Sequence, residues 1–323
     1  MSGGVVVPDL TIVIPSYRSE RWVARAIGSA LEEGTLAQNL IVVEDGVFDG
    51  TADVVRGFEG VRLVSLERNL GAPHARNLGL SMATTRYVMF LDVDDYVENG
   101  LLRGLVDRLD QESADLAIGP WRYDGNGSER RVLRVPVALD NGERIFRWKV
   151  SREFFPPCCV AWRAESLRAI GGWDEQLRKD QDGELVIRAL TRGLRVAVST
   201  QGNGVYWQHH SPHRVHHAHP EHVMHAAEVT YRQIRDWVDA CAAPARERYR
   251  TELGRYCCKT AWIAYSRGDD EAGAQWSGRA RKLGFSRRGY NTSSALLAAL
   301  FGMRMSSRIK TRGMSIYHRL AHR

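Results

Sequence analysis

The sequence has 323 residues, of which 44% are hydrophobic and 26% charged, a composition typical of globular proteins. This length suits one large domain with an appendage, and the lack of a run of about 18 apolar residues predicts no membrane-spanning helix. The five cysteines follow neither a disulfide nor a zinc-binding spacing. No signal-peptide pattern precedes the first apolar run, so we expect reduced thiols and a cytoplasmic protein.

The net charge of +7 comes from the C-terminal part of the chain. Residues 272–323 contain eleven Lys and Arg and neither Asp nor Glu, whereas the preceding residues contain 34 basic and 38 acidic side chains. A basic tail on an otherwise slightly acidic protein predicts an anionic partner for that tail, such as a membrane surface or a nucleic acid.

Apolar strands alternate with helices in the first third of the chain. We expect strands at residues 10–14 (ended by Pro15), 40–43, 61–66 and 87–91, and helices at 22–33, after the turn at 49–51, and at 72–82. This alternation is typical of a parallel sheet covered by helices.

The pattern is less regular after residue 98. We expect helices at 99–109 and 182–191, strands at 116–118, 159–162, 195–199 and 205–208, a hairpin tip at 125–127, and only helices from residue 220 onward.

Acidic residues follow the strand at 87–91 directly, as Asp92, Asp94 and Asp95. In an extended backbone, Asp92 and Asp94 would point to the same side, where their charges repel unless a cation lies between them. Carboxylate oxygens suit Mg²⁺ or Mn²⁺, which keep few protein ligands and bridge to phosphates. The stretch therefore predicts a metal site for a diphosphate, with a solvated acidic turn as the alternative.

Two further polar clusters also follow expected strands, one from Pro15 to Tyr17 and one at Glu44 and Asp45. Ligands of open parallel sheets bind beyond the carboxyl ends of the strands. Because all three clusters fall at such ends, we expect them to form one binding edge.

These stretches, together with two others, resemble the inverting glycosyltransferases of family two, over roughly residues 9–217. The matching pieces are Ile12-Val13-Ile14-Pro15-Ser16-Tyr17, Val42-Val43-Glu44-Asp45-Gly46 with Asp49-Gly50-Thr51, Asn69-Leu70-Gly71 with Ala75-Arg76-Asn77-Leu78-Gly79, Phe90-Leu91-Asp92-Val93-Asp94-Asp95, and Gly171-Gly172-Trp173-Asp174 with Gln181-Asp182-Gly183-Glu184.

The resemblance implies an α/β GT-A fold, a Rossmann-like and mostly parallel sheet flanked by helices. The catalytic domain would cover residues 1–217, with a nucleotide-sugar half at about 8–120 and an acceptor half at 121–217. Residues 218–323 would form a helical, basic C-terminal extension.

The resemblance also implies a donor site for a nucleotide sugar, for which we expect a UDP-sugar. Asp45 would accept the N3–H of a uracil ring, a charge-assisted hydrogen bond, and Glu44 stands where the family often has a further Asp. Pro15 and Tyr17 would line the nucleotide pocket, or else simply end a strand. Arg76 would lie near the diphosphate, or else be an exposed helix arginine.

The metal of the family, Mn²⁺ or Mg²⁺, would be held by its D-x-D motif. Asp94 is the expected direct ligand, with Asp92 nearer the ribose or a metal-bound water, and Asp95 would orient its neighbours. The family often adds a histidine after a later strand, where His209 or His210 stands, and we choose His210. Eight of the eleven histidines lie between residues 209 and 225, so a zinc site and a solvated surface are alternatives.

An inverting transfer needs a base to take the proton of the attacking hydroxyl. Asp182 matches the family's position for this base, with Glu184 as the second candidate. Asp182 could instead be a helix N-cap. Trp173 and Asp174 would touch the acceptor or have only structural roles.

The acceptor is expected to be a glycan or a lipid-linked glycan in cell-envelope polysaccharide biosynthesis. The Gln-x-x-Arg-Trp motif of the processive synthases is absent, which favours one or few additions. Apolar and basic residues at 296–312 predict a peripheral contact with the inner face of a membrane, or alternatively a helical cap or a dimer contact. A homo-oligomer is compatible with this sequence.

Two other functions are each compatible with part of the sequence. A nucleotidyltransferase shares the acidic strand end, but it needs a basic triphosphate loop where the sequence offers only Arg18 and Arg21. A non-catalytic protein that binds nucleic acid or nucleotide through the tail would leave the acidic edge unexplained, so we expect no nucleic-acid partner. The missing P-loop, G-x-G-x-x-G and G-x-S-x-G motifs exclude the simplest kinase, dehydrogenase and hydrolase interpretations.

Overall fold

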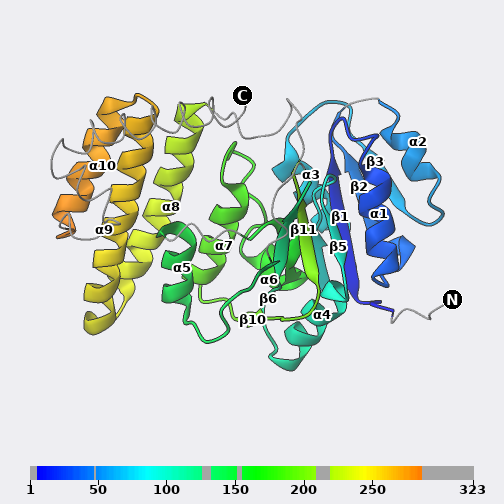
Figure 1. Cartoon of the computed structure of the whole chain (residues 1–323), viewed down its shortest axis with the longest axis horizontal. Coiled ribbons are helices and arrows are strands. Elements are labelled where there is room, and N and C mark those ends of the chain that lie inside the picture. The colour runs from blue at the N-terminus through cyan, green and yellow to red at the C-terminus, as the bar shows by residue number, and fades with distance from the viewer. Residues whose placement is uncertain (1–5, 47–48, 126–131, 151–154, 209–218, 286–323) are drawn as a thin grey trace. The chain divides into compact units, whose positions relative to one another are not determined.

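The computed structural model describes residues 6–46, 49–125, 132–150, 155–208 and 219–285 (Figure 1). Its contacts divide the chain into two units, and each is described by itself. The first comprises Met1–Asn141, Phe154–Leu177 and Arg188–Arg214, and the second comprises Gly142–Glu153, Arg178–Ile187 and Val215–Arg323. The expected domain boundary after residue 217 stays a prediction.

The first unit is built on a seven-stranded sheet with the order β10-β6-β9-β4-β1-β2-β3. Its strands are β1 (Leu10–Ser16), β2 (Leu40–Glu44), β3 (Arg62–Ser65), β4 (Tyr87–Phe90), β6 (Leu116–Ile118), β9 (Val160–Arg163) and β10 (Val196–Val198). All pairs are parallel except those of β9, which runs antiparallel to β4 and β6. The expected α/β fold with a mostly parallel sheet is confirmed.

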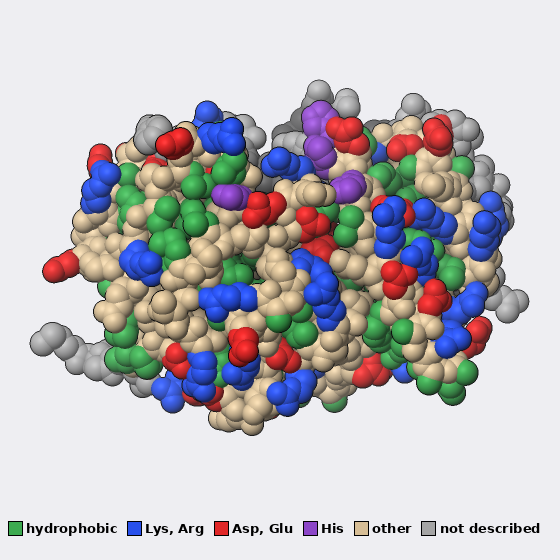
Figure 2. All heavy atoms as spheres, turned by 180° about the vertical axis from the view of Figure 1, so that it is seen from behind, with side chains coloured by type: hydrophobic (Ala, Val, Ile, Leu, Met, Phe, Trp, Pro, Cys, Tyr) green, Lys and Arg blue, Asp and Glu red, His purple; other side chains and the backbone are tan. Residues whose placement is uncertain are grey.

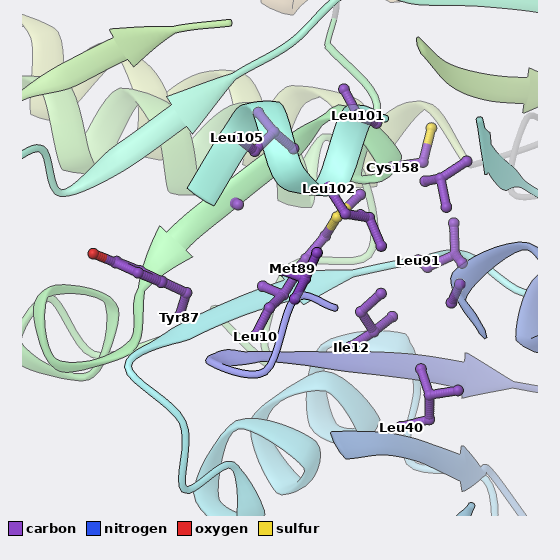
Figure 3. Close-up of a cluster of buried hydrophobic side chains, with 14 of the residues drawn as sticks. Leu10, Ile12, Leu40, Tyr87, Met89, Leu91, Leu101, Leu102, Leu105 and Cys158 are labelled. Carbon is purple, nitrogen blue, oxygen red and sulfur yellow. The ribbon is translucent and has the colours of Figure 1, made fainter. Parts of the chain in front are cut away.

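Helices cover the sheet and bury its central strands completely. They are α1 (Val23–Glu32), α2 (Thr51–Arg56), α3 (Ala72–Met82), α4 (Leu101–Gln111) and α6 (Ala164–Ala169), with the short 3-10 helices η1 (Ala37–Asn39) and η2 (Pro157–Cys159). Figure 3 shows alternate residues of β1, β2 and β4, among them Ile12, Leu40 and Met89, in one cluster with Leu101 and Leu105 of α4. Apolar residues of α1 complete this cluster, because strands covered on both faces must be apolar throughout.

Helix α3 packs closely on the sheet, and a glycine makes this approach possible. A Cβ atom at Gly79 would lie 2.2 Å from Cγ1 of Val13 on β1. Helix α3 also carries Arg76, so this close packing fixes how the helix presents that side chain.

The prediction that Pro15 ends the first strand is wrong. Pro15 pairs in register with Val43 of β2, and the strand continues to Ser16. The pairing with β4 stops at Val13 and Phe90, after which the Leu91 N–H donates to the Val13 carbonyl. Alternate residues of a strand direct their N–H groups to opposite neighbours. The missing N–H of Pro15 would point to the side of β4, which has already ended there, so no hydrogen bond of the sheet is lost.

A second, four-stranded sheet in the first unit was missed at the sequence level. Its order is β5-β11-β7-β8, with β5 (Tyr96–Glu98), β7 (Trp121–Asp124), β8 (Val132–Leu133) and β11 (Asn203–Trp207). The expected strand at 205–208 belongs to this sheet. The tip expected at 125–127 lies largely outside the described residues, although β7 and β8 do pair antiparallel.

The described part of the second unit is helical. It contains α8 (Pro220–Ala240), α9 (Ala243–Ser266), α10 (Asp270–Lys282), nearly all of α5 (Asn141–Val150) and the first residues of α7 (Gln181–Thr191). The ring of Trp276 is buried and meets Tyr231 edge-on at 5.4 Å, which joins α10 to α8. The expected helices from residue 220 are confirmed as far as Lys282, and the basic segment at 296–312 lies outside the described residues.

Within the described residues, no helix is both long and apolar enough to cross a membrane. Basic and acidic side chains are intermingled on the face shown in Figure 2, as is usual for a solvated surface.

Candidate functional site

The candidate site of the first unit lies at the carboxyl edge of β4, β1 and β2, which are neighbours in the sheet. Tyr17 follows β1, Asp45 follows β2, and the acidic stretch with Asp92 and Asp94 follows β4. Because these strands are parallel, their carboxyl ends meet at one edge. The structure therefore places the predicted nucleotide and D-x-D residues on the same edge of one sheet.

The acidic residues form a turn and not the extended stretch that was expected. Strand β4 ends at Phe90, and the Asp95 N–H donates to the Asp92 carbonyl across 2.8 Å. The turn leads directly into β5 of the small sheet, so the backbone cannot stay in the plane of the large one. Asp92 and Asp94 therefore do not lie in a strand, and the alternation of side chains along a strand does not predict where they point.

Arg76 of α3 is paired with this turn. Its guanidinium donates from Nη2 to Oδ1 of Asp92 across 2.6 Å, and only 4% of the residue is exposed. The same guanidinium lies 4.3 Å from the ring centroid of Trp173, which meets Phe90 edge-on at 5.2 Å. Arg76 is therefore not an exposed helix arginine but a buried charge balanced by an acid and an aromatic face.

Asn77 joins α3 to the stretch that carries Trp173. Its Oδ1 accepts the Trp173 N–H at 2.8 Å, and its Nδ2 donates to the Trp173 carbonyl at 2.9 Å and to Glu175 at 2.8 Å. Glu175 also contacts His74 at 2.9 Å. The two motifs at 75–79 and 171–174 thus form one structure, in which Trp173 is a buried platform for Arg76. The sequence showed both motifs but not that they touch.

Arg25 of α1 was missed by the sequence analysis. It donates from Nη2 to the Asp94 carbonyl at 2.7 Å, while its guanidinium lies 4.3 Å from the Trp207 ring and 4.9 Å from the Tyr96 ring. Burial lowers the pKa of Arg25 and outweighs the coulombic interactions with Tyr96 and the nearby acids, which raise this pKa. A weak signal was present, because Trp22 lies three residues earlier on the same helix, where side chains meet.

Asp95 connects the acidic turn to the small sheet. Its side chain is fully buried and accepts the Trp207 N–H at 2.9 Å. Burial, and then the charges of Asp94 and Asp92, raise the pKa of Asp95 well above its ordinary value. The expectation that Asp95 orients its neighbours agrees with this contact, which holds the turn on β11.

Asp45 is fixed by the backbone of the loop after β3. The Leu70 N–H donates to its Oδ1 at 2.7 Å and the Gly71 N–H to its Oδ2 at 2.8 Å. Gly46 lets this loop approach, since it has a φ of +69° and a Cβ there would lie 2.0 Å from the Arg68 carbonyl carbon. Each carboxylate oxygen has two lone pairs and accepts one of these donors, so each keeps one lone pair for a further donor.

The other predicted nucleotide residues differ in burial. Glu44 is buried, its Oε2 accepts from Ser65 at 2.7 Å, and its Oε1 has no hydrogen-bond partner among the described residues. Pro15 is buried within β1. Tyr17 is 40% exposed, and its ring, 5.4 Å from the Arg18 guanidinium, is open to a ligand.

The predicted base lies in the second unit. Helix α7 begins at Gln181, so Asp182 is in its first turn and is not its N-cap. The residue before the helix is Asp180, with a φ of +56°. Glu184 is only 1% exposed and accepts from Nε2 of Gln233 at 2.5 Å, whereas Asp182 is partly exposed.

The predicted histidine ligand His210 lies outside the described residues, as do all histidines from 209 to 217. Helix α8 begins at Pro220, and the rings of His219 and His222 at its start are 6.0 Å apart. Among the described residues, the structure brings no three His, Cys, Asp or Glu side chains into a metal-binding group. The hard oxygen donors of Asp92 and Asp94 fit Mg²⁺ or Mn²⁺, which take few protein ligands and complete their shell with phosphate.

Comparison with known proteins agrees with this geometry. The family model "Glycosyl transferase family 2" matches residues 11–171. The succinoglycan biosynthesis protein ExoO of Rhizobium meliloti is 32% identical over 213 residues, which are 62% of this chain and 61% of the relative. The poly(ribitol-phosphate) beta-N-acetylglucosaminyltransferase TarP of Staphylococcus aureus is 31% identical over 136 residues, 40% of each chain. The chain thus spans less than two thirds of these curated relatives.

Solved structures show the same fold at low sequence identity. Staphylococcus aureus TarS in complex with UDP has a TM-score of 0.59 and 16% identity, covering 85% of this chain and 91% of its own. The mannosyltransferase PcManGT of Pyrobaculum calidifontis, in complex with GDP-Man and Mn²⁺, has a TM-score of 0.54 and 16% identity. The match covers 94% of this chain and 86% of PcManGT. The expected GT-A fold is confirmed, and residues 11–171 of the chain form a glycosyl transferase family 2 domain.

Proposed function

We propose that this protein transfers a sugar from a nucleotide sugar, specifically a UDP-sugar, to a hydroxyl group of a glycan or lipid-linked glycan, with inversion at the anomeric carbon. The observation that carries the proposal is the carboxyl edge of the large sheet. There a backbone-fixed acid, Asp45, and a turn with two partly exposed acids, Asp92 and Asp94, follow neighbouring parallel strands.

The nucleoside would bind beside β1 and β2. Asp45 has capacity for the N3–H of uracil, and its two backbone donors fix the orientation of the carboxylate that would accept it. The exposed ring of Tyr17 offers a surface for stacking, and the buried residues Pro15 and Glu44 would help to line the pocket. The complexes of TarS with UDP and with UDP-GlcNAc support this choice of nucleotide.

The diphosphate would bind at the acidic turn. Asp94, with Asp92, would hold Mn²⁺ or Mg²⁺, and the ion would supply Lewis-acid stabilisation of the departing nucleoside diphosphate. Arg76 holds Asp92 in place and adds a positive charge next to that position. His210 stays a candidate for a further ligand.

The acceptor hydroxyl would lose its proton to Asp182 as its oxygen attacks the anomeric carbon. Attack on the face opposite the nucleotide exchanges the substituents on that carbon and inverts its configuration. Asp182 suits this role better than Glu184, because Glu184 is buried and occupied by Gln233.

The names of the relatives support a role in cell-envelope polysaccharide biosynthesis, with succinoglycan and poly(ribitol-phosphate) as examples of their products or acceptors. We further propose that one or few sugars are added, that the protein acts in the cytoplasm, and that the basic tail contacts the membrane where a lipid-linked acceptor would lie.

Calorimetric titration tests the donor half of this proposal. UDP, GDP and dTDP would be titrated with and without Mn²⁺ into wild type, Asp94→Ala and Asp107→Ala. The last change removes an exposed acid of α4 that pairs with Arg103 on the same helix. We expect metal-dependent binding of UDP that Asp94→Ala abolishes and Asp107→Ala retains. Binding of none of the three with metal present would refute the donor site.

A screen of UDP-sugars against glycan acceptors tests the chemistry. Wild-type turnover should appear with at least one sugar, and Asp182→Asn should bind UDP normally while its rate falls at least about 100-fold, the order of a lost general base. Retained configuration in the product, determined by NMR of the new glycosidic linkage, would contradict the inverting mechanism.

A further inference from the structure

Within the second unit, the first turn of α7 is held by an ion pair from outside its own helix. The ammonium of Lys149, near the end of α5, pairs with the carboxylate of Asp180, the residue directly before α7. Only 6% of the Lys149 side chain is exposed, against 43% for Asp180. An ammonium is taken out of water only where a partner compensates the lost hydration, so this pair fixes the place of both residues.

Gly183 lies directly against this ion pair. A Cβ atom at Gly183 would be 2.2 Å from Oδ1 of Asp180 and 2.7 Å from Nζ of Lys149. The Glu184 N–H also donates to the Asp180 carbonyl at 2.9 Å, which closes the turn. The ion pair therefore packs on the backbone one residue away from Asp182.

Helices α8 and α9 support the same turn. Gln233 of α8 donates to the buried Glu184, and Nζ of Lys259 on α9 donates to the Lys149 carbonyl at 2.6 Å. The hydroxyl of Tyr256 on α9 donates to the Ala227 carbonyl of α8 at 3.1 Å, which joins the two supports. These helices lie beyond the residues matched by the family model, which end at 171.

We infer that Lys149 is a positioning residue for Asp182, and that the helices at 220–282 are part of the acceptor-side machinery. Three acids, Asp180, Asp182 and Glu184, stand within five residues at the start of α7. Lys149 pairs with Asp180, the first of these acids, and the pair packs against Gly183, so the first turn keeps one conformation. Without Lys149, Asp180 would turn toward water and the turn would lose the contact that fixes it. The inference rests on the proposed function, in which Asp182 is the base.

The experiment compares Lys149→Met, Lys149→Arg and Asp180→Asn with a matched control, Arg248→Met. Arg248 on α9 pairs with Glu143 on α5 at 2.8 Å, so the control cuts a different ion pair to the same helix. Asp180→Asn removes the charge of the pair with almost no change of shape, which covers the case in which Lys149→Met does not fold. Hydrogen exchange of the peptide covering 178–187 and steady-state kinetics are measured on all four full-length variants.

Lys149→Met and Asp180→Asn should speed exchange in 178–187 about tenfold and lower kcat about 10- to 100-fold, because small displacements of a reacting group have effects of that size. The affinity for UDP should not change, since the donor residues lie in the first unit. Lys149→Arg should restore most of kcat, and Arg248→Met should match wild type in both measurements.

Two results would overturn the inference. The first is a rate of hydrogen exchange in 178–187 that does not differ between the control Arg248→Met and the two variants Lys149→Met and Asp180→Asn. The other is faster exchange with an unchanged kcat, which would mean that the turn is ordered by Lys149 but that this order does not serve the reaction. A wild-type protein inactive with every UDP-sugar would refute the proposed function instead, while the exchange measurement would still decide whether Lys149 holds the turn.

Discussion

Arg76 donates a hydrogen bond from Nη2 to Oδ1 of Asp92 across 2.6 Å, at the edge where the diphosphate of the donor is proposed to bind. The pair joins α3 to the acidic turn after β4, and Trp173 supports it from one side. A cation is thus built into the protein beside Asp92 and orients this carboxylate before any metal binds.

We predict that Arg76→Met raises the dissociation constant of UDP measured with Mn²⁺ by about 10- to 100-fold, the usual effect of losing a partner that orients a metal ligand. The dissociation constant of Arg76→Lys should lie between those of wild type and Arg76→Met, because an ammonium keeps the charge but lacks the planar fork of a guanidinium. Arg62→Met removes an exposed arginine of β3 that donates to the Met82 carbonyl at the C-terminal end of α3, and this variant should bind UDP like wild type. Equal affinities of Arg76→Met and Arg62→Met would contradict the assigned role.

Arg25 acts on the other acid of the turn through its backbone. Because Arg25 holds the Asp94 carbonyl and is itself held by Trp207 and Tyr96, we predict that Arg25→Met raises about tenfold the Mn²⁺ concentration that gives half-maximal UDP binding. Titration of Mn²⁺ at fixed UDP measures this. Arg103→Met on α4 is the control, and a Mn²⁺ requirement that does not move in Arg25→Met would show that the turn keeps its shape without Arg25.

Two helix glycines should respond in opposite directions to replacement by alanine. Gly79→Ala places a methyl group 2.2 Å from Val13, and we predict a loss of about 1–3 kcal/mol in the free energy of unfolding. At Gly28 on α1 an added Cβ would meet no described atom within 4 Å beyond the adjoining helix backbone, so Gly28→Ala should stabilise the protein by up to about 1 kcal/mol through helix propensity. Urea unfolding measures both.

The double variant Gly79→Ala with Val13→Ala tests whether the clash with Val13 causes the loss of stability. If the clash with Val13 is the reason for the loss, the two changes together should destabilise less than the sum of the single changes. Strict additivity would show that α3 does not pack on Val13 as described.

Asp124 of β7 should make stability depend on pH in the acid range. Burial alone would raise its pKa, but hydrogen bonds from Arg122 and Tyr96 outweigh burial and lower the pKa to about 2. Since the pKa in the folded state is below the ordinary value of 3.8, the ionised form stabilises the fold above that value, and this contribution is lost as the pH falls toward 2.

We therefore predict that Asp124→Asn lowers the free energy of unfolding by about 2 kcal/mol at pH 7, and that its difference from wild type shrinks between pH 4 and pH 2. Urea unfolding at several pH values measures this difference. Asp107→Asn, an exposed acid in an i,i+4 pair, should show almost no difference at any pH. A gap between Asp124→Asn and wild type that is the same at pH 7 and pH 2.5 would contradict the prediction.

The sequence by itself determined the elements of the large sheet and the edge at which the site lies. The apolar runs at β1, β2 and β4 and the helical spacing of α1 are local patterns, because burial on a strand or helix repeats with the period of its own backbone. The bounds of α3, Ala72–Met82, could be predicted in this way. The carboxyl-edge position of Asp45, Asp92 and Asp94 followed from the general rule for parallel sheets, with no knowledge of contacts.

Only the tertiary structure decided which side chains meet. The pairing of Arg76 with Asp92, the hold of Asn77 on Trp173, and the support of the start of α7 by Lys149 each join residues that are 16 to 96 positions apart. The small sheet and the turn at 92–95 depend in the same way on β11, which comes more than a hundred residues later. A local pattern states that a residue is buried, but the partner of a buried charge is set by packing between distant segments, which has no period in the sequence.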